Sequence, residues 1–142
     1  MSKFLEPRPG REENTSAYLG GGVIKFYGKP STKTRLHELG HKVLGHEPGL
    51  MALNELIDRE LDAESYAYRA MDKPLTYKIG ISIVCELVQD WGLSPSEASG
   101  LVERRLAARG IKVSRRARQD LNWFAHGLQS GRTEVLEKGG IC

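Results

Sequence analysis

The sequence predicts an α+β fold that is mostly helical, in which a short N-terminal β-hairpin or sheet lies beside one helix and a helical C-terminal part follows. Residues 17–27 gather apolar and aromatic side chains around three consecutive glycines, which is typical of one or two short strands joined by a tight turn or bulge. Five later stretches between residues 32 and 127 repeat apolar residues at helical spacing. Capping residues, glycines and prolines separate these stretches, which predicts five helices.

The chain has 142 residues, of which 39% are hydrophobic and 27% charged, with a net charge of +3. This composition is typical of a single globular domain. We expect four parts within it: a flexible arm over residues 1–14, a core over 15–75, a helical portion over 76–128 and a flexible tail over 129–142. No apolar run approaches the ~18 residues of a membrane span, and the N-terminus lacks an apolar signal segment. We therefore expect a cytoplasmic protein without membrane contact.

The first predicted helix covers about residues 32–44. Ser31 or Thr32 can cap its N-terminus, and Gly45 supplies a C-terminal stop. Gly40 lies inside this helix, where glycine costs about 1 kcal/mol relative to alanine. Such a glycine is easier to understand if another backbone packs close to the helix, so we expect a neighbouring element to approach it there.

The same helix carries an H-E-x-x-H motif, which is typical of zinc-dependent hydrolases. The chain has only two cysteines, so any metal must be held by histidine and carboxylate. Residues four apart share one helix face, roughly 6 Å from one another, so His37 and His41 can bind one ion. Glu38 lies about 100° further round, where its carboxylate can act as a general base beside the metal's open position. The alternative is a solvated helix on which these three residues occur by coincidence.

The second predicted helix, over about residues 50–71, is rich in carboxylates that could supply a third metal ligand. Glu60 and Glu64 are four apart and share a face, whereas Asp62 points roughly 160° away on the helical wheel. We predict Glu60 as the third zinc ligand and Glu64 as the residue that orients a ligand histidine. Asp62 and Glu64 remain alternative ligands, and acids that are not used are expected to be solvated.

The C-terminal third of the chain is its basic part. A third helix over about residues 77–91 is the most apolar, a capping box at 94–97 opens a fourth helix to about 109, and a last helix spans about 114–127. Seven basic residues and no acidic one lie where the last two helices join, namely Arg104, Arg105, Arg109, Lys112, Arg115, Arg116 and Arg118. A solvated basic face is the favoured interpretation. Contact of Arg104–Arg118 with nucleic acid phosphates, or docking of an acidic substrate protein, are the alternatives.

Over residues 37–46 and 59–67 the sequence resembles the ImmA/IrrE family of zinc metallopeptidases, which is common in bacteria, phages and mobile elements. Members typically show H-E-[L/I]-G-H, then a leucine, a glycine and often another histidine, followed by a helix with an acidic residue, an alanine and an aromatic–alanine pair. These features fall between residues 20 and about 71 here. The resemblance implies a zincin-like core over 15–75, and characterised relatives imply cleavage of a transcriptional repressor.

The resemblance also implies a set of site residues. Zinc would be held by His37, His41 and an acidic residue of the second helix, with Glu38 as catalytic acid and base. Many members have glutamate directly before the alanine, where this chain has Asp62. The resemblance therefore leaves open whether Asp62 or Glu60 is the third ligand.

We expect a zinc metalloendopeptidase of the HExxH type, in which Glu38 activates a zinc-bound water for attack on a peptide bond. Its substrate would be a protein or peptide, such as a repressor or another regulatory protein. Tyr66, Tyr27, His46 and His126 are candidates for contact with the substrate or the developing oxyanion, although packing is the alternative role for the tyrosines. The alternative function is a non-catalytic DNA- or repressor-binding module with a structural zinc site. Glu38 favours the enzyme, because a structural site does not need a base beside the metal.

Overall fold

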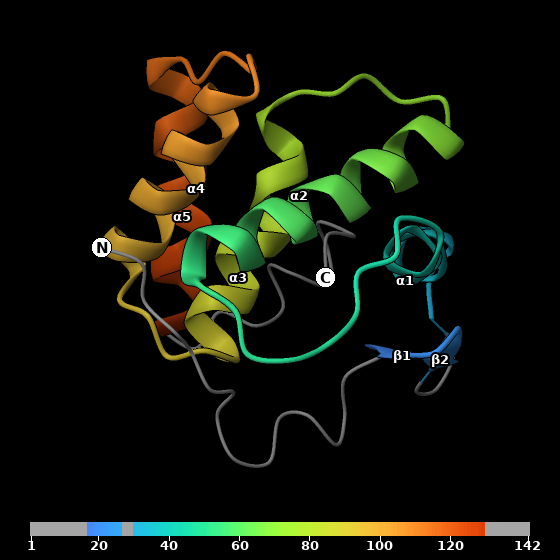
Figure 1. Ribbon diagram of the computed structural model, residues 1–142. Helices are drawn as coiled ribbons and strands as arrows, with labels where there is room; N and C mark the ends of the chain where they lie inside the picture. The colour runs from blue at the N-terminus through green and yellow to red at the C-terminus, as the bar shows by residue number, and fades with distance from the viewer. Residues whose placement is uncertain (1–16, 27–29, 130–142) are drawn as a thin grey trace. The chain divides into compact units, whose positions relative to one another are not determined.

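The structure of this chain, a computed structural model, describes residues 17–26 and 30–129. The chain divides into two compact units, residues 1–75 and 76–142. The predicted mostly helical α+β class is confirmed, because one two-stranded hairpin precedes the helices (Figure 1). The expected arm over 1–14 and nearly all of the expected tail over 129–142 lie outside the described residues, and the single-domain organisation stays a prediction.

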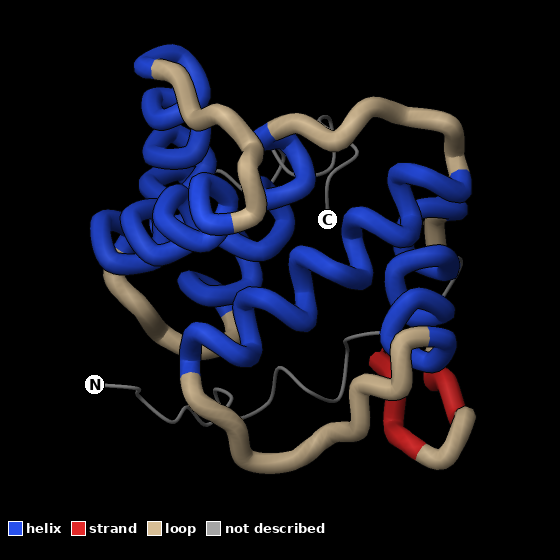
Figure 2. Tube along the Cα trace, turned by 45° about the horizontal axis from the view of Figure 1, so that its top comes forward, coloured by secondary structure: helices blue, strands red, loops and turns tan. Residues whose placement is uncertain are grey.

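The first unit begins with an antiparallel β-hairpin made of β1 (Ala17–Gly20) and β2 (Val23–Lys25), drawn in red in Figure 2. The register slips between Tyr18 and Gly20, which is the bulge that the glycine-rich sequence predicted. The three glycines at 20–22 all have positive φ angles, a backbone conformation that glycine adopts at little cost. The glycine run therefore makes the turn of the hairpin.

Helix α1 (Thr32–Val43) follows the hairpin and packs against it. Its N-cap is Ser31, whose hydroxyl accepts a hydrogen bond from the N–H of the third helical residue. Its C-terminus is a Schellman turn: Gly45 has a φ of 72°, and the N–H of His46 donates to the carbonyl of His41 at 2.9 Å. This turn fixes the backbone of His46 directly beneath the last turn of the helix.

Helix α2 (Leu53–Ala70) packs along α1, and the two helices form the body of the first unit. Gly40 lies at their contact. A Cβ atom added there would be 3.1 Å from the carbonyl oxygen of Ala63 and 3.1 Å from Cβ of Tyr66. The close approach of a neighbouring backbone that the glycine predicted is therefore confirmed, and it brings the H-E-x-x-H face of α1 against α2.

The loop between α1 and α2 is held to both neighbours by Glu47. Its carboxylate accepts hydrogen bonds from the hydroxyl of Tyr18 and the N–H of Gly21, each at 3.2 Å. Its carbonyl accepts a hydrogen bond from the guanidinium of Arg59 on α2 at 2.7 Å. These contacts tie the hairpin, the end of α1 and α2 together around one loop.

The regular secondary structure described in the second unit is all helical. It comprises the 3-10 turn η2 (Tyr77–Gly80) and the helices α3 (Ile81–Gln89), α4 (Pro95–Ala108) and α5 (Arg115–Gln129). The predicted third helix thus begins as a tighter 3-10 turn. Its core consists of buried apolar side chains of these helices, among them Ile79, Ile83, Leu87, Val102, Leu106 and Leu121.

The predicted basic stretch covers the end of α4, the following loop and the first turns of α5. Two of its members pair with acids of the same unit: Arg118 donates to Glu103 at 2.8 Å, and Arg116 lies 3.6 Å from Asp120. Contact with nucleic acid stays a prediction. Among the helices described, none combines the length and hydropathy that crossing a bilayer requires.

Candidate metal centre

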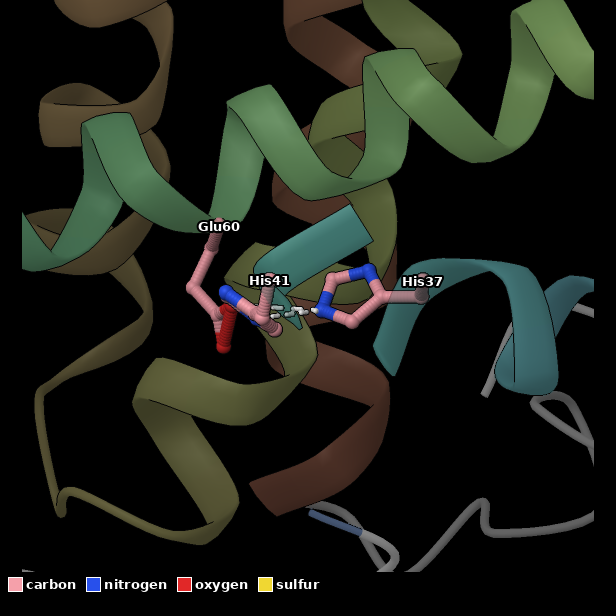
Figure 3. A group of neighbouring side chains, drawn as sticks. All are labelled: His37, His41 and Glu60. Atoms are coloured by element: carbon pink, nitrogen blue, oxygen red, sulfur yellow. Dashed lines mark hydrogen bonds and ion pairs between the residues drawn. The ribbon is translucent and has the colours of Figure 1, made fainter. Parts of the chain in front are cut away.

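Three potential ligand atoms converge where α1 contacts α2 (Figure 3). Nε2 of His37 lies 3.1 Å from Nε2 of His41 and 3.1 Å from Oε2 of Glu60. Nε2 of His41 lies 2.5 Å from the same oxygen. The three side chains are between 11% and 14% exposed, so the group is largely shielded but still reached by solvent. The structure therefore brings together the three residues that the sequence predicted as ligands.

The spacing of these atoms suits a metal ion. Zinc is bound at about 2.0–2.2 Å by histidine nitrogen and carboxylate oxygen, which places neighbouring ligands of a tetrahedral site about 3.3–3.5 Å apart. Two of the three separations are 3.1 Å, and the third is shorter. Small outward movements of flexible side chains would complete that geometry. The group could hold a metal ion.

The ring of His37 is oriented by Glu64. Its Nδ1 lies 2.7 Å from Oε1 of Glu64, and Oε2 of the same carboxylate accepts a hydrogen bond from Lys33 at 3.3 Å. The side chain of Glu64 is only 1% exposed. An ionised carboxylate accepts hydrogen bonds but cannot donate them, so the Nδ1 of His37 carries the proton. When the ring is neutral, as a metal ligand must be, its lone pair is therefore on Nε2, the atom next to the other two possible ligand atoms.

The charges of the group shift the pKa values of its members in opposite directions. Burial opposes charge on His37, but the carboxylates of Glu60 and Glu64 outweigh it and raise the pKa of His37 well above its ordinary value. Burial alone would raise the pKa of Glu60, yet His37 and His41 lower it well below its ordinary value. Without a metal, a proton on the imidazole of His37 would relieve the repulsion between the lone pairs of the histidine nitrogens and the Glu60 oxygen. A divalent cation would replace that proton.

Glu38 is buried one residue after the first histidine, with 8% of its surface exposed. Burial is the main reason that the pKa of its carboxyl is raised, and the charge of Glu60 adds to the effect. His37, His41 and a backbone hydrogen bond from Tyr18 act in the opposite direction. A buried carboxyl with a raised pKa beside possible ligands is the pattern expected of a proton-transfer group.

The remaining predicted residues of the first unit lie around this group. The side chain of Asp62 is 45% exposed and is not part of the converging set, whereas Glu60 is, so the helical-wheel argument selected the residue that faces the histidines. His46 contacts the other nitrogen of the His41 ring, and the two Nδ1 atoms are 3.1 Å apart. Tyr66 is half-buried, and its Cβ packs at Gly40.

The structure describes the two other candidates to different extents. Tyr27 lies outside the described residues. His126 lies on α5 in the second unit, where it is exposed and its Nδ1 donates to the carbonyl of Asn122 at 2.8 Å. Sequence reasoning missed Lys33, although its position four residues before His37 on the same helix face was a usable signal.

Comparison with known proteins adds no assignment. No family model matches this chain, and no curated protein or solved structure matches it either. The resemblance to the ImmA/IrrE family therefore stays a prediction.

Proposed function

We propose that this protein is a zinc-dependent metallopeptidase of the HExxH type, with His37, His41 and Glu60 as metal ligands and Glu38 as general base. The observation that carries the proposal is the convergence of three ligand atoms from two helices beside a buried glutamate with a raised pKa. The choice of a peptide bond as substrate depends on the order of residues in the motif. We further propose a cytoplasmic location and, from the family resemblance, a repressor or other regulatory protein as substrate.

Zinc fits this donor set, and the H-E-x-x-H order favours it over Fe(II), which two histidines and one carboxylate also bind. Two imidazole nitrogens and one carboxylate oxygen form the ligand type of catalytic zinc sites, whereas calcium and magnesium prefer oxygen ligands alone. Held by these three residues, zinc would supply Lewis-acid chemistry: it would polarise a carbonyl group and lower the pKa of a water molecule to about 7.

Glu38 and Glu64 have different roles in the proposed hydrolysis. Glu38 accepts a proton from the attacking water and delivers it to the leaving amine. Its raised pKa suits this role, because a general base works best when its pKa lies near the pH of the reaction. Glu64 holds the proton on Nδ1 of His37, which keeps Nε2 available as a ligand atom. The low exposure of the group excludes most competing water and strengthens these interactions.

The test uses the full chain purified with and without added zinc. We expect about one zinc per chain, cleavage of an unstructured protein substrate, and loss of cleavage when a chelator is added. Glu38→Gln should keep the zinc and lose cleavage, whereas His37→Ala or His41→Ala should lose the metal. Undiminished cleavage by Glu38→Gln would refute the role of this residue, and a protein without metal affinity would refute the proposal as a whole.

The alternative is a nucleic-acid-binding module in which the metal is structural. The observation that favours it is the run of basic residues at the junction of α4 and α5. Binding to phosphates would weaken steeply with salt. Salt-sensitive retention of DNA together with zinc binding but no cleavage would support this module instead of the peptidase.

A further inference from the structure

We propose that His46 is a positioning residue for the metal centre: it accepts a hydrogen bond from Nδ1–H of His41 and so presents the Nε2 lone pair of His41 to the metal. The proposal rests on the metal-binding part of the proposed function and is independent of peptidase activity. It assigns to His46 a role different from the substrate contact that the sequence suggested.

Between two neutral rings, a hydrogen bond at this contact can run in either of two directions. Nδ1 of His41 lies 3.1 Å from Nδ1 of His46, and a neutral imidazole has one N–H and one lone pair. One ring must therefore donate to the other. If His46 donates, His41 carries its proton on Nε2 and points it at Glu60, 2.5 Å away, which is the arrangement suited to a metal-free centre.

The other arrangement suits a metal-loaded centre. Metal at Nε2 of His41 requires the proton of this ring to be on Nδ1, so His46 must accept it at its own Nδ1. The proton of His46 is then on Nε2, which lies 3.9 Å from Oδ2 of Asp62. The partial positive charge of that N–H faces a carboxylate. In this arrangement Nε2 of His41 would bind the metal, Nδ1 of His41 donates to Nδ1 of His46, and Nε2–H of His46 lies near Asp62.

The fold places His46 independently of the metal. The Schellman turn at Gly45 fixes its backbone through the bond from its N–H to the carbonyl of His41. The adjacent residue, Glu47, is held by the hairpin and by Arg59. The side chain of His46 is 14% exposed, so water competes little for the acceptor position. His46 is therefore held as a preformed support for His41, in the way that Glu64 supports His37.

Two substitutions of similar shape separate the acceptor from the packing. In His46→Asn the amide oxygen occupies the position of Nδ1 and can accept the same hydrogen bond, whereas His46→Leu has the same branching without an acceptor. Zinc affinity of the full chain is measured by competition with a chromophoric chelator. We expect His46→Leu to bind zinc about 10- to 100-fold more weakly than the wild type, the range found for partners of ligand histidines. His46→Asn should remain close to the wild type.

Spectroscopy of the wild-type chain gives a second measurement that does not depend on how a variant folds. In the zinc-loaded protein, nitrogen NMR of the imidazoles should find the proton of His41 on Nδ1 and that of His46 on Nε2. Equal zinc affinity of wild type and His46→Leu, an equal loss in both variants, or a proton on Nδ1 of His46 would each overturn the inference. A wild type that binds no zinc would overturn the proposed function as well, so the two failures can be distinguished.

Discussion

Gly40→Ala tests how closely α1 must approach α2 for the ligands to converge. Alanine is favoured over glycine inside a helix by about 1 kcal/mol. The new methyl group, however, would lie 3.1 Å from the carbonyl oxygen of Ala63, 3.2 Å from its Cα and 3.1 Å from Cβ of Tyr66. These atoms belong to or adjoin the backbone of α2 and cannot rotate away, so the helices must separate by a few tenths of an ångström.

Overpacking of this kind costs about 1–3 kcal/mol, which exceeds or cancels the gain in helix propensity. We therefore expect Gly40→Ala to lower the free energy of unfolding of the metal-free chain by about 0–2 kcal/mol, the difference between these two terms. Because the histidines lie on α1 and Glu60 on α2, separation of the helices should also weaken zinc binding. Urea unfolding followed by circular dichroism and the chelator competition measure the two effects.

Gly100→Ala is the matched control. Gly100 lies inside α4, where a Cβ would meet only a guanidinium nitrogen of Arg104, at 3.6 Å. That is an ordinary contact with the end of a flexible side chain, so this substitution should stabilise the chain by about 1 kcal/mol and leave zinc affinity unchanged. A Gly40→Ala variant as stable as Gly100→Ala, with unchanged zinc affinity, would refute the packing argument.

Two further predictions concern the charges of the centre. Glu64→Gln replaces a charge-assisted hydrogen bond to His37 with a neutral one and should weaken zinc binding about 10- to 100-fold, whereas Glu55→Gln, an exposed change on the same helix, should have no effect in the chelator competition. In the metal-free chain, the raised pKa of His37 stabilises the fold fully below the ordinary pKa of 6.5, and this stability is lost as pH rises through the pKa of the folded state. The lowered pKa of Glu60 stabilises the fold fully above the ordinary pKa of 4.5, and this stability is lost as pH falls through the pKa of the folded state. Unfolding measured against pH should therefore show the full contribution of the pair between 4.5 and 6.5, and a chain in which both residues are replaced by glutamine should lose that feature.

The part of the site that follows helical periodicity could be predicted from the sequence. The spacing of His37 and His41 fixed their common face, and the spacing within α2 distinguished Glu60 from Asp62 because residues two apart point to opposite sides. Gly40 indicated close packing through its position inside a helix, where glycine is otherwise unfavourable. Each of these inferences uses geometry within one helix.

The parts that depend on how separate segments meet could not be predicted. The bonds from Glu47 to the hairpin require the loop after α1 to fold back on residues more than twenty positions earlier. The contact of His46 with His41 follows from a Schellman turn whose glycine was recognised only as a helix stop. The helical periodicity of a sequence does not predict such contacts, because they depend on how separate segments are placed relative to one another.

The burial of Glu38 bears most directly on the choice between a catalytic and a structural metal site. Removing a carboxylate from water costs free energy, and the raised pKa of Glu38 records that cost. A structural site gains nothing from such a group, because its stability comes from the ligands themselves. Glu64 shows the contrast: it is buried as well, but its carboxylate orients His37, whereas Glu38 accepts a backbone hydrogen bond from Tyr18 and orients neither histidine in this way. A buried glutamate that lies beside the possible ligands but is not one of them suits proton transfer, and it supports the proposed hydrolase over a structural metal site.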